Sequence, residues 1–205
     1  MLESGSEVGH LAQATKTAGL FLSASQLRTS AHPVWFLVLF LPMGITNGYV
    51  VVTLGYLLTH AGIGVATVAA LVAVSMTPHM LKVLWAPLVD TTLSYKSWFL
   101  LSNLATGILM AAASLVSDPA RHLLALDAMV FAFSLANTFN CMAADGLMAH
   151  TTAPEERGRA GGWSQAGNLG GTGLGGGAGL WLAQHVASGW AVGAAQGAAC
   201  SLTSL

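Results

Sequence analysis

Polar side chains stand within long apolar runs of this chain, where an uncompensated polar group is costly. Asn137 and Asn140 are three residues apart and therefore share one face of a helix. Asp127 lies near the start of the same run, where its carboxylate can reach water. Polar groups at membrane depth usually face a cavity or a partner helix. The two amides therefore predict either a polar pathway or interhelical hydrogen bonds that fix packing.

A second polar group stands where the first apolar run is interrupted. Asn47 and Tyr49 flank Gly48, and Pro42 and Gly44 precede them. Clustered proline and glycine weaken a helix, so an irregular backbone is expected here. Transporters commonly place substrate contacts at such interruptions. Asn47 and Tyr49 are therefore candidate pathway residues, with a plain kink as the alternative.

The stretch from 160 to 186 is rich in glycine. Part of it satisfies a G-x-G-x-x-G pattern, but no strand precedes it and no βαβ unit can surround it, so a dinucleotide site is excluded. Spacing by four marks one helix face instead, with Gly173 and Gly177 as a second pair. The face consists of Gly167, Gly171, Gly175 and Gly179. Faces of small residues let helix backbones approach closely, so tight packing on another helix is expected.

Motifs for metal binding and nucleophilic catalysis are not evident. His60, His122 and His185 fall at expected helix ends, but no H-E-x-x-H or H-x-x-E-H pair fixes a ligand geometry. The chain also has no G-x-S-x-G elbow. We therefore expect no enzyme activity, no metal and no cofactor, with haem held between histidines as a remote alternative.

The composition determines the class of protein. Of 205 residues 54% are hydrophobic and 7% are charged, whereas a soluble domain carries about 25% charged residues. The net charge is −1, and no cluster of basic residues could neutralise a run of phosphates, which excludes nucleic-acid binding. The two cysteines, Cys141 and Cys200, are too few for a disulfide framework. The sequence therefore predicts a polytopic membrane protein.

We expect an all-α membrane bundle, because the apolar runs lack the alternation of strands. At about 20 residues per span, there is room for five spans and a partial sixth. An amino-terminal segment is expected at residues 1–32 and the bundle at 33–205. The expected spans are 34–58, 61–81, 97–117, 122–144 and 160–186, and the partial one is 190–205.

The distribution of basic residues predicts the orientation, because segments on the cytoplasmic side carry the excess of Lys and Arg. Only Arg121 falls on the opposite side. The basic residues that share the other side are Lys16, Arg28, Lys82, Lys96, Arg157 and Arg159. The amino terminus is therefore expected in the cytoplasm.

Asp90 belongs to the segment from Lys82 to Trp98, KVLWAPLVDTTLSYKSW, which joins the second and third expected spans. A carboxylate at a helix end can hold helix termini or a basic partner, and a solvated loop carboxylate is the alternative. With its W-A-P-L-V-D motif the sequence resembles the major facilitator superfamily, in particular its AmpG-like and acetyl-CoA-transporter-like branch. The resemblance implies that Asp90 belongs to a cytoplasmic gating motif, whose basic residue here is Lys96.

The resemblance extends through the fourth expected span and the loop after it. Asp145, just past the end of that span, matches an acid of the branch, and some relatives carry another acid where this sequence has Cys141. The E-E-R-G-like loop of the branch matches Glu155, Glu156, Arg157 and Gly158. The resemblance implies that Asp145 and Arg157 also belong to the gate.

Together these features predict the amino-terminal half of a secondary transporter that moves a small solute across the bacterial inner membrane by alternating access. Its expected partners are membrane lipid, the solute with a candidate coupling proton, and a second helical half or another copy of the chain. The resemblance implies muropeptide-like or acyl-nucleotide-like solutes. The alternative is a non-transporting assembly or scaffold subunit that docks through the glycine face.

Overall fold

The computed structural model describes residues 32–116, 121–185 and 189–202, and every regular element within these ranges is a helix. The expected all-α fold is therefore confirmed for the part of the chain that is described. The segment expected at 1–32 lies outside the described residues, apart from His32.

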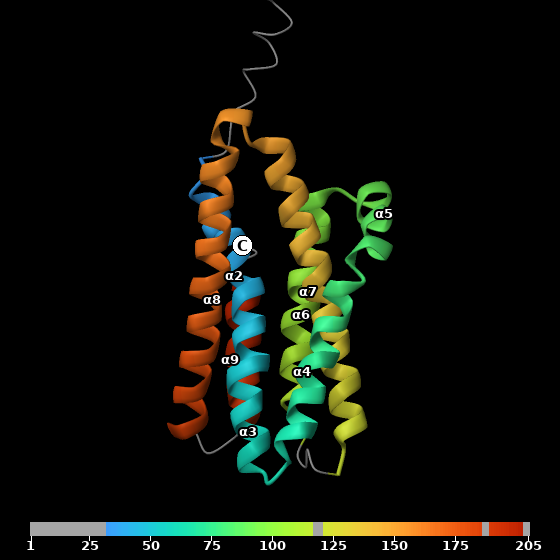
Figure 1. The fold of residues 1–205 in the computed structure, drawn as a ribbon, viewed down its shortest axis with the longest axis vertical. Helices are drawn as coiled ribbons and strands as arrows, with labels where there is room; N and C mark the ends of the chain where they lie inside the picture. The colour runs from blue at the N-terminus through green and yellow to red at the C-terminus, as the bar shows by residue number, and fades with distance from the viewer. Residues whose placement is uncertain (1–31, 117–120, 186–188, 203–205) are drawn as a thin grey trace, which may run out of the picture. The chain divides into compact units, whose positions relative to one another are not determined.

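The helices follow the apolar runs closely (Figure 1). The first run forms α2 (Trp35–Gly48), the π-helix η1 (Tyr49–Leu54) and α3 (Gly55–His60) without a break. The π-helix begins directly after Gly48, which places the expected backbone irregularity at Tyr49. The remaining elements are α4 (Val65–Met80), α5 (Lys82–Thr92), α6 (Tyr95–Ala113), α7 (Leu123–Thr151), the 3-10 turn η2 (Pro154–Glu156), α8 (Arg157–His185) and α9 (Gly189–Leu202).

The connection between the second and third runs is itself helical. α4 contains Pro78 and ends at Met80, and the chain bends by 48° before α5 begins at Lys82. α5 buries Val89, while Ser94 caps the next helix by accepting a 3.1 Å hydrogen bond from the Ser97 amide. The segment from Lys82 to Thr92 is thus a short helix bent away from α4.

Two helical runs in the described residues are long and apolar enough to cross a membrane, Trp35–His60 and Leu123–Thr151. A third candidate arises if α4 and α5 form one bent span. α8 has 29 residues, but glycine and polar residues reduce its apolar character, and α9 has only 14 residues, fewer than the roughly 20 that cross a bilayer. The expected count of five spans is therefore not established.

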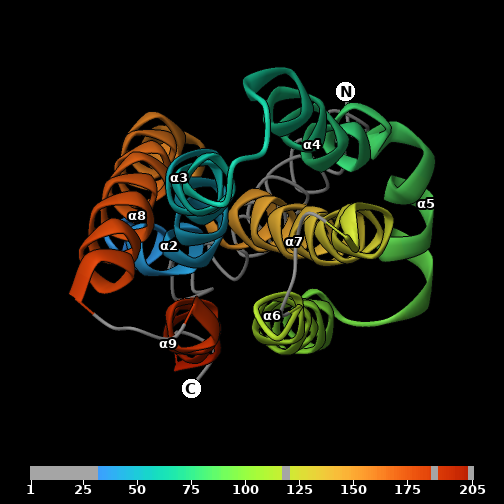
Figure 2. The same cartoon turned by 90° about the horizontal axis from the view of Figure 1, so that it is seen from below.

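Glycines place α8 directly against α2, as Figure 2 shows from below. A Cβ atom at Gly167, Gly171 or Gly175 would overlap the backbone of α2. Gly44 and Gly48 face the backbone of α8 in the same way. The two helices therefore touch backbone to backbone, which is the packing expected of a glycine face.

A second close crossing joins α6 and α9. A Cβ atom at Gly197 would overlap the backbone carbonyl of Gly107, and Gly193 lies against Ser114. The Asn103 side chain donates a 2.6 Å hydrogen bond to the Cys200 carbonyl. Short as it is, α9 is docked through both backbone contact and a buried hydrogen bond.

Two apolar clusters form the core of the bundle. The Tyr49 cluster consists of Tyr49, Val50, Leu54, Leu58, Val68, Leu71, Met110, Ala113, Leu126, Val130 and Phe133. The Phe36 cluster consists of Phe36, Phe40, Phe99, Ala143, Ala144 and Ala160. Both clusters draw on α2 or its continuation, on α6 and on α7, so these helices connect the two.

Candidate solute pathway and gate

Between the two apolar clusters, α2, α6 and α7 each carry buried polar side chains. We call this set the polar layer; each side chain in it is at most 2% exposed. Along each helix these residues separate residues of the Tyr49 cluster from residues of the Phe36 cluster. The polar layer consists of Thr46, Asn103, Thr106, Asn137 and Asn140. Buried polar groups thus cross the core at one level.

Most of the polar layer is satisfied by the protein itself. Thr46 donates to the Pro42 carbonyl at 3.0 Å, and Thr106 donates to the Ser102 carbonyl at 2.8 Å. Asn140 Nδ2 donates to the Phe99 carbonyl of α6 at 3.4 Å. These bonds include the interhelical kind that fixes packing. Asn140 therefore has a structural role in joining α7 to α6, whatever else it does.

Asn137 is the residue of this layer whose side chain has no hydrogen bond at all among the described residues, while Asn140 has an unpartnered Oδ1 there. Asn137 is 1% exposed, and neither Oδ1 nor Nδ2 has a hydrogen-bond partner among the described residues. An unsatisfied buried polar group costs about 1–3 kcal/mol. The amide therefore has an unused acceptor and unused donors within the buried polar layer.

The other expected pathway residues lie on the side of this layer that faces the Tyr49 cluster. Tyr49 is 2% exposed, packs edge-on to Phe133 and lies 3.5 Å from the Ser114 hydroxyl. Asn47 is half-buried in α2, one residue beyond Thr46 of the polar layer. Asp127 is half-buried near the start of α7, next to Leu126 of the Tyr49 cluster and before Val130 and Phe133 of the same cluster. Asp127 is thus separated from Asn137 by apolar core.

An ion pair joins α5 to α7. Lys82 Nζ donates to Asp145 Oδ2 at 2.7 Å and to Cys141 Sγ at 3.3 Å. Asp145, expected just past the end of the span 122–144, lies within a helix, because α7 continues to Thr151. Cys141 and Asp145 therefore share one helix face, and Lys82 lies against both.

Asp90 lies in the same region. A groove of about 420 Å³ between α5 and α7 is lined by Lys82, Asp90 and Asp145, among others. Tyr95 at the start of α6 donates a 3.0 Å hydrogen bond to Asp90 Oδ1. The Tyr95 ring lies over Gly146, and a Cβ atom at Gly146 would overlap this ring. The absent side chain at Gly146 thus lets Tyr95 reach Asp90.

Of the four expected gate residues, the structure brings two to one groove. Asp90 and Asp145 line it, whereas Lys96 and Arg157 are exposed and have no hydrogen bond or ion pair within the described residues. The basic residue that pairs with Asp145 is Lys82, for which the sequence predicts only a contribution to the orientation. Two features of the sequence could have indicated this pair. Cys141 and Asp145 are four residues apart on one helix face, and Lys82 follows shortly after Pro78, where a bend is expected.

Comparisons with known proteins identify no relative. No protein-family model matches the chain, no curated protein matches it, and no solved structure matches it. Within the described residues, no group of three His, Cys, Asp or Glu side chains is arranged to hold a metal ion.

Proposed function

We propose that this chain is one helical bundle of a secondary active transporter that moves a small polar solute by alternating access. The observation that carries the proposal is Asn137, an amide without a protein partner among the described residues, in the buried polar layer. An unsatisfied amide destabilises the bundle, and a solute that hydrogen-bonds to it offsets that cost. Asn140, Asn47 and Tyr49 are proposed to extend the pathway on either side.

The proposed cytoplasmic gate is the groove between α5 and α7. Lys82 binds Asp145 and Tyr95 binds Asp90, so one contact lies at each end of α5. The Lys82 and Asp145 side chains are 36% and 43% exposed. Because water competes for partly exposed ion pairs, such contacts can open at small cost. Their release would let α5 move relative to α7.

A single bundle does not provide alternating access, which needs two units rocking around a central site. The proposed second unit is another helical half or another copy of this chain. Lys96 and Arg157 are exposed, so they are available to contact that unit. The W-A-P-L-V-D motif supports the proposed membership of the major facilitator superfamily and, with it, a location in the bacterial inner membrane. The excess of Lys and Arg on one side of the expected spans supports an amino terminus inside.

A scaffold subunit that docks through Gly167, Gly171, Gly175 and Gly179 has less support. Most of that face packs against α2 within the same chain. A scaffold would therefore have to use a different surface.

Uptake by native cells tests the proposal. Radiolabelled muropeptide and radiolabelled acyl-nucleotide are supplied separately to cells that carry the wild-type chain, Asp90→Asn or Asn137→Leu. We expect uptake of one solute by the wild type and at least tenfold less by both variants, at equal amounts of membrane-inserted protein. Unchanged uptake in both variants, or no uptake of either solute above a deletion strain, would contradict transport through this site.

A further inference from the structure

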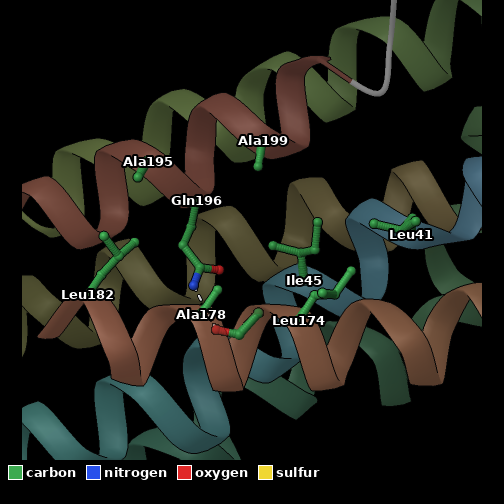
Figure 3. Close-up of a pocket in the computed structure, with 9 residues that line it drawn as sticks. Leu41, Ile45, Leu174, Ala178, Leu182, Ala195, Gln196 and Ala199 are labelled. Carbon is green, nitrogen blue, oxygen red and sulfur yellow. Dashed lines mark hydrogen bonds between the residues drawn. The ribbon is translucent and has the colours of Figure 1, made fainter. Parts of the chain in front are cut away.

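An apolar groove of about 390 Å³ lies between α8 and α9, next to α2 (Figure 3). Leu41 and Ile45 of α2 form its floor, and Leu174 and Leu182 lie along its α8 wall. The groove exists because α8 packs mainly on α2 and α9 mainly on α6. Small residues such as Ala178 leave the space between them unfilled. Its volume falls in the range of small-molecule sites.

Gln196 is the one residue with a polar side chain among those that line the groove. It is 4% exposed, and its Nε2 donates a 2.6 Å hydrogen bond to the Gly175 carbonyl. The Thr53 hydroxyl donates to the same carbonyl at 3.2 Å. This fixes the amide orientation and leaves Gln196 Oε1 with no partner among the described residues. Figure 3 shows that oxygen directed along the groove toward Ile45.

The chemistry of the groove restricts what can bind there. A neutral amide oxygen accepts hydrogen bonds and donates none, so a ligand that satisfies it must carry an N–H or O–H donor. Among the described residues, no ionisable side chain lines the groove, which disfavours any charged group, because burying an unpaired charge is very costly. The remaining surface matches hydrocarbon.

We propose that this groove binds an uncharged single-chain amphiphile. The hydrocarbon chain lies along α8 between Leu174 and Leu182, and its hydroxyl group donates to Gln196 Oε1. The site does not contain the polar layer or the gate, so it stands whether or not the chain transports a solute.

Competitive photolabelling tests this site in the full chain, reconstituted in phosphatidylcholine nanodiscs. The probe is dodecan-1-ol with a diazirine at the end of the chain that is remote from the hydroxyl group. The competitors are dodecan-1-ol and 1-methoxydodecane, which lacks the O–H donor. We expect the alcohol to compete about tenfold better than the ether, because one hydrogen bond to a buried acceptor corresponds to about a tenfold difference in affinity. Gln196→Met, which keeps the side-chain length, should remove that preference.

A matched pair of variants on α8 controls for partition into the lipid. Ala178→Leu fills the groove and should abolish specific labelling, whereas Ala166→Leu, exposed and outside the lining, should label like the wild type. Equal competition by alcohol and ether, or equal labelling of the two leucine variants, would overturn the proposal. The proposal would also be overturned if the wild type forms a dimer that Ala178→Leu dissociates, while neither protein shows specific labelling. That result would indicate that a second copy of the chain occupies the groove.

Discussion

The Lys82 ammonium lies 2.7 Å from Asp145 Oδ2 and joins the first residue of α5 to α7. At the other end of α5, Asp90 accepts a hydrogen bond from Tyr95 of α6. The bent helix is therefore attached to the bundle at both ends, by contacts that are open to water. This arrangement makes α5 the element whose position a gate would control.

Lys82→Met should loosen α5. It removes the ion pair and leaves Asp145 and Cys141 without their shared partner, at a cost of about 1 kcal/mol in the free energy of unfolding. For a chain of this size that corresponds to a melting temperature roughly 2–4 °C lower. Thermal unfolding in detergent measures it. Lys96→Met, at an exposed lysine without a partner in the described residues, is the control; an equal shift in both variants would argue against the ion pair.

Gly171→Ala should separate α2 from α8. The new Cβ would overlap the Leu41 carbonyl oxygen, and overpacking of this kind costs about 1–3 kcal/mol. Gly173→Ala on the same helix meets nothing within 4 Å and should gain roughly 0.5–1 kcal/mol from helix propensity. Denaturation of the two variants should therefore shift in opposite directions. Equal destabilisation would mean that the α2–α8 contact is not as close as described.

Asp90→Asn should change the titration of Tyr95, which precedes the span expected from residue 97. The hydrogen bond to the Asp90 carboxylate raises the pKa of the Tyr95 phenol above that of an ordinary tyrosine. The contribution of this bond to stability is complete below the ordinary pKa and is lost as the pH rises through the raised pKa. Tyrosinate absorbance, assigned with Tyr95→Phe, should show the pKa falling in Asp90→Asn. An unaltered titration would show that the two side chains do not interact.

Asn137→Leu and Asn140→Leu should differ in stability. Replacing Asn137 removes an unsatisfied amide, so the free energy of unfolding should stay constant or rise by about 1 kcal/mol. Replacing Asn140 removes the hydrogen bond to Phe99 and should lower it by about 1 kcal/mol. Chemical denaturation compares the two. If Asn137→Leu is the more destabilised protein, the Asn137 amide has a structural partner and is not an open binding group.

The sequence predicts the helices of this bundle well, because uncharged runs of sufficient length form helices whatever their surroundings. It also marks the glycine face of α8, since a spacing of four is local information. Which helix covers that face depends on glycines far away, at Gly44 and Gly48, and only the fold shows the pairing.

The residues of the proposed gate are less predictable, because their contacts depend on the bend after Met80. That bend directs Lys82 at the Cys141–Asp145 face of α7, more than fifty residues away in the chain. Similarly, Gln196 lies in the partial span expected at 190–205, where the sequence predicts no site. Its role appears only when α9 packs beside α8 and Gly175 accepts its amide hydrogen.

The most direct test of the account is the accessibility of Asn137 to water. Asn137→Cys is expressed in native membranes and exposed to a membrane-impermeant maleimide in right-side-out and inside-out vesicles. The background is a chain with Cys141→Ala and Cys200→Ala, which removes both native cysteines and is the negative control, and Thr59→Cys at an exposed helix end is the positive control. A solute pathway predicts labelling of Asn137→Cys from both faces. Labelling from neither face, with Thr59→Cys reactive, would contradict the account.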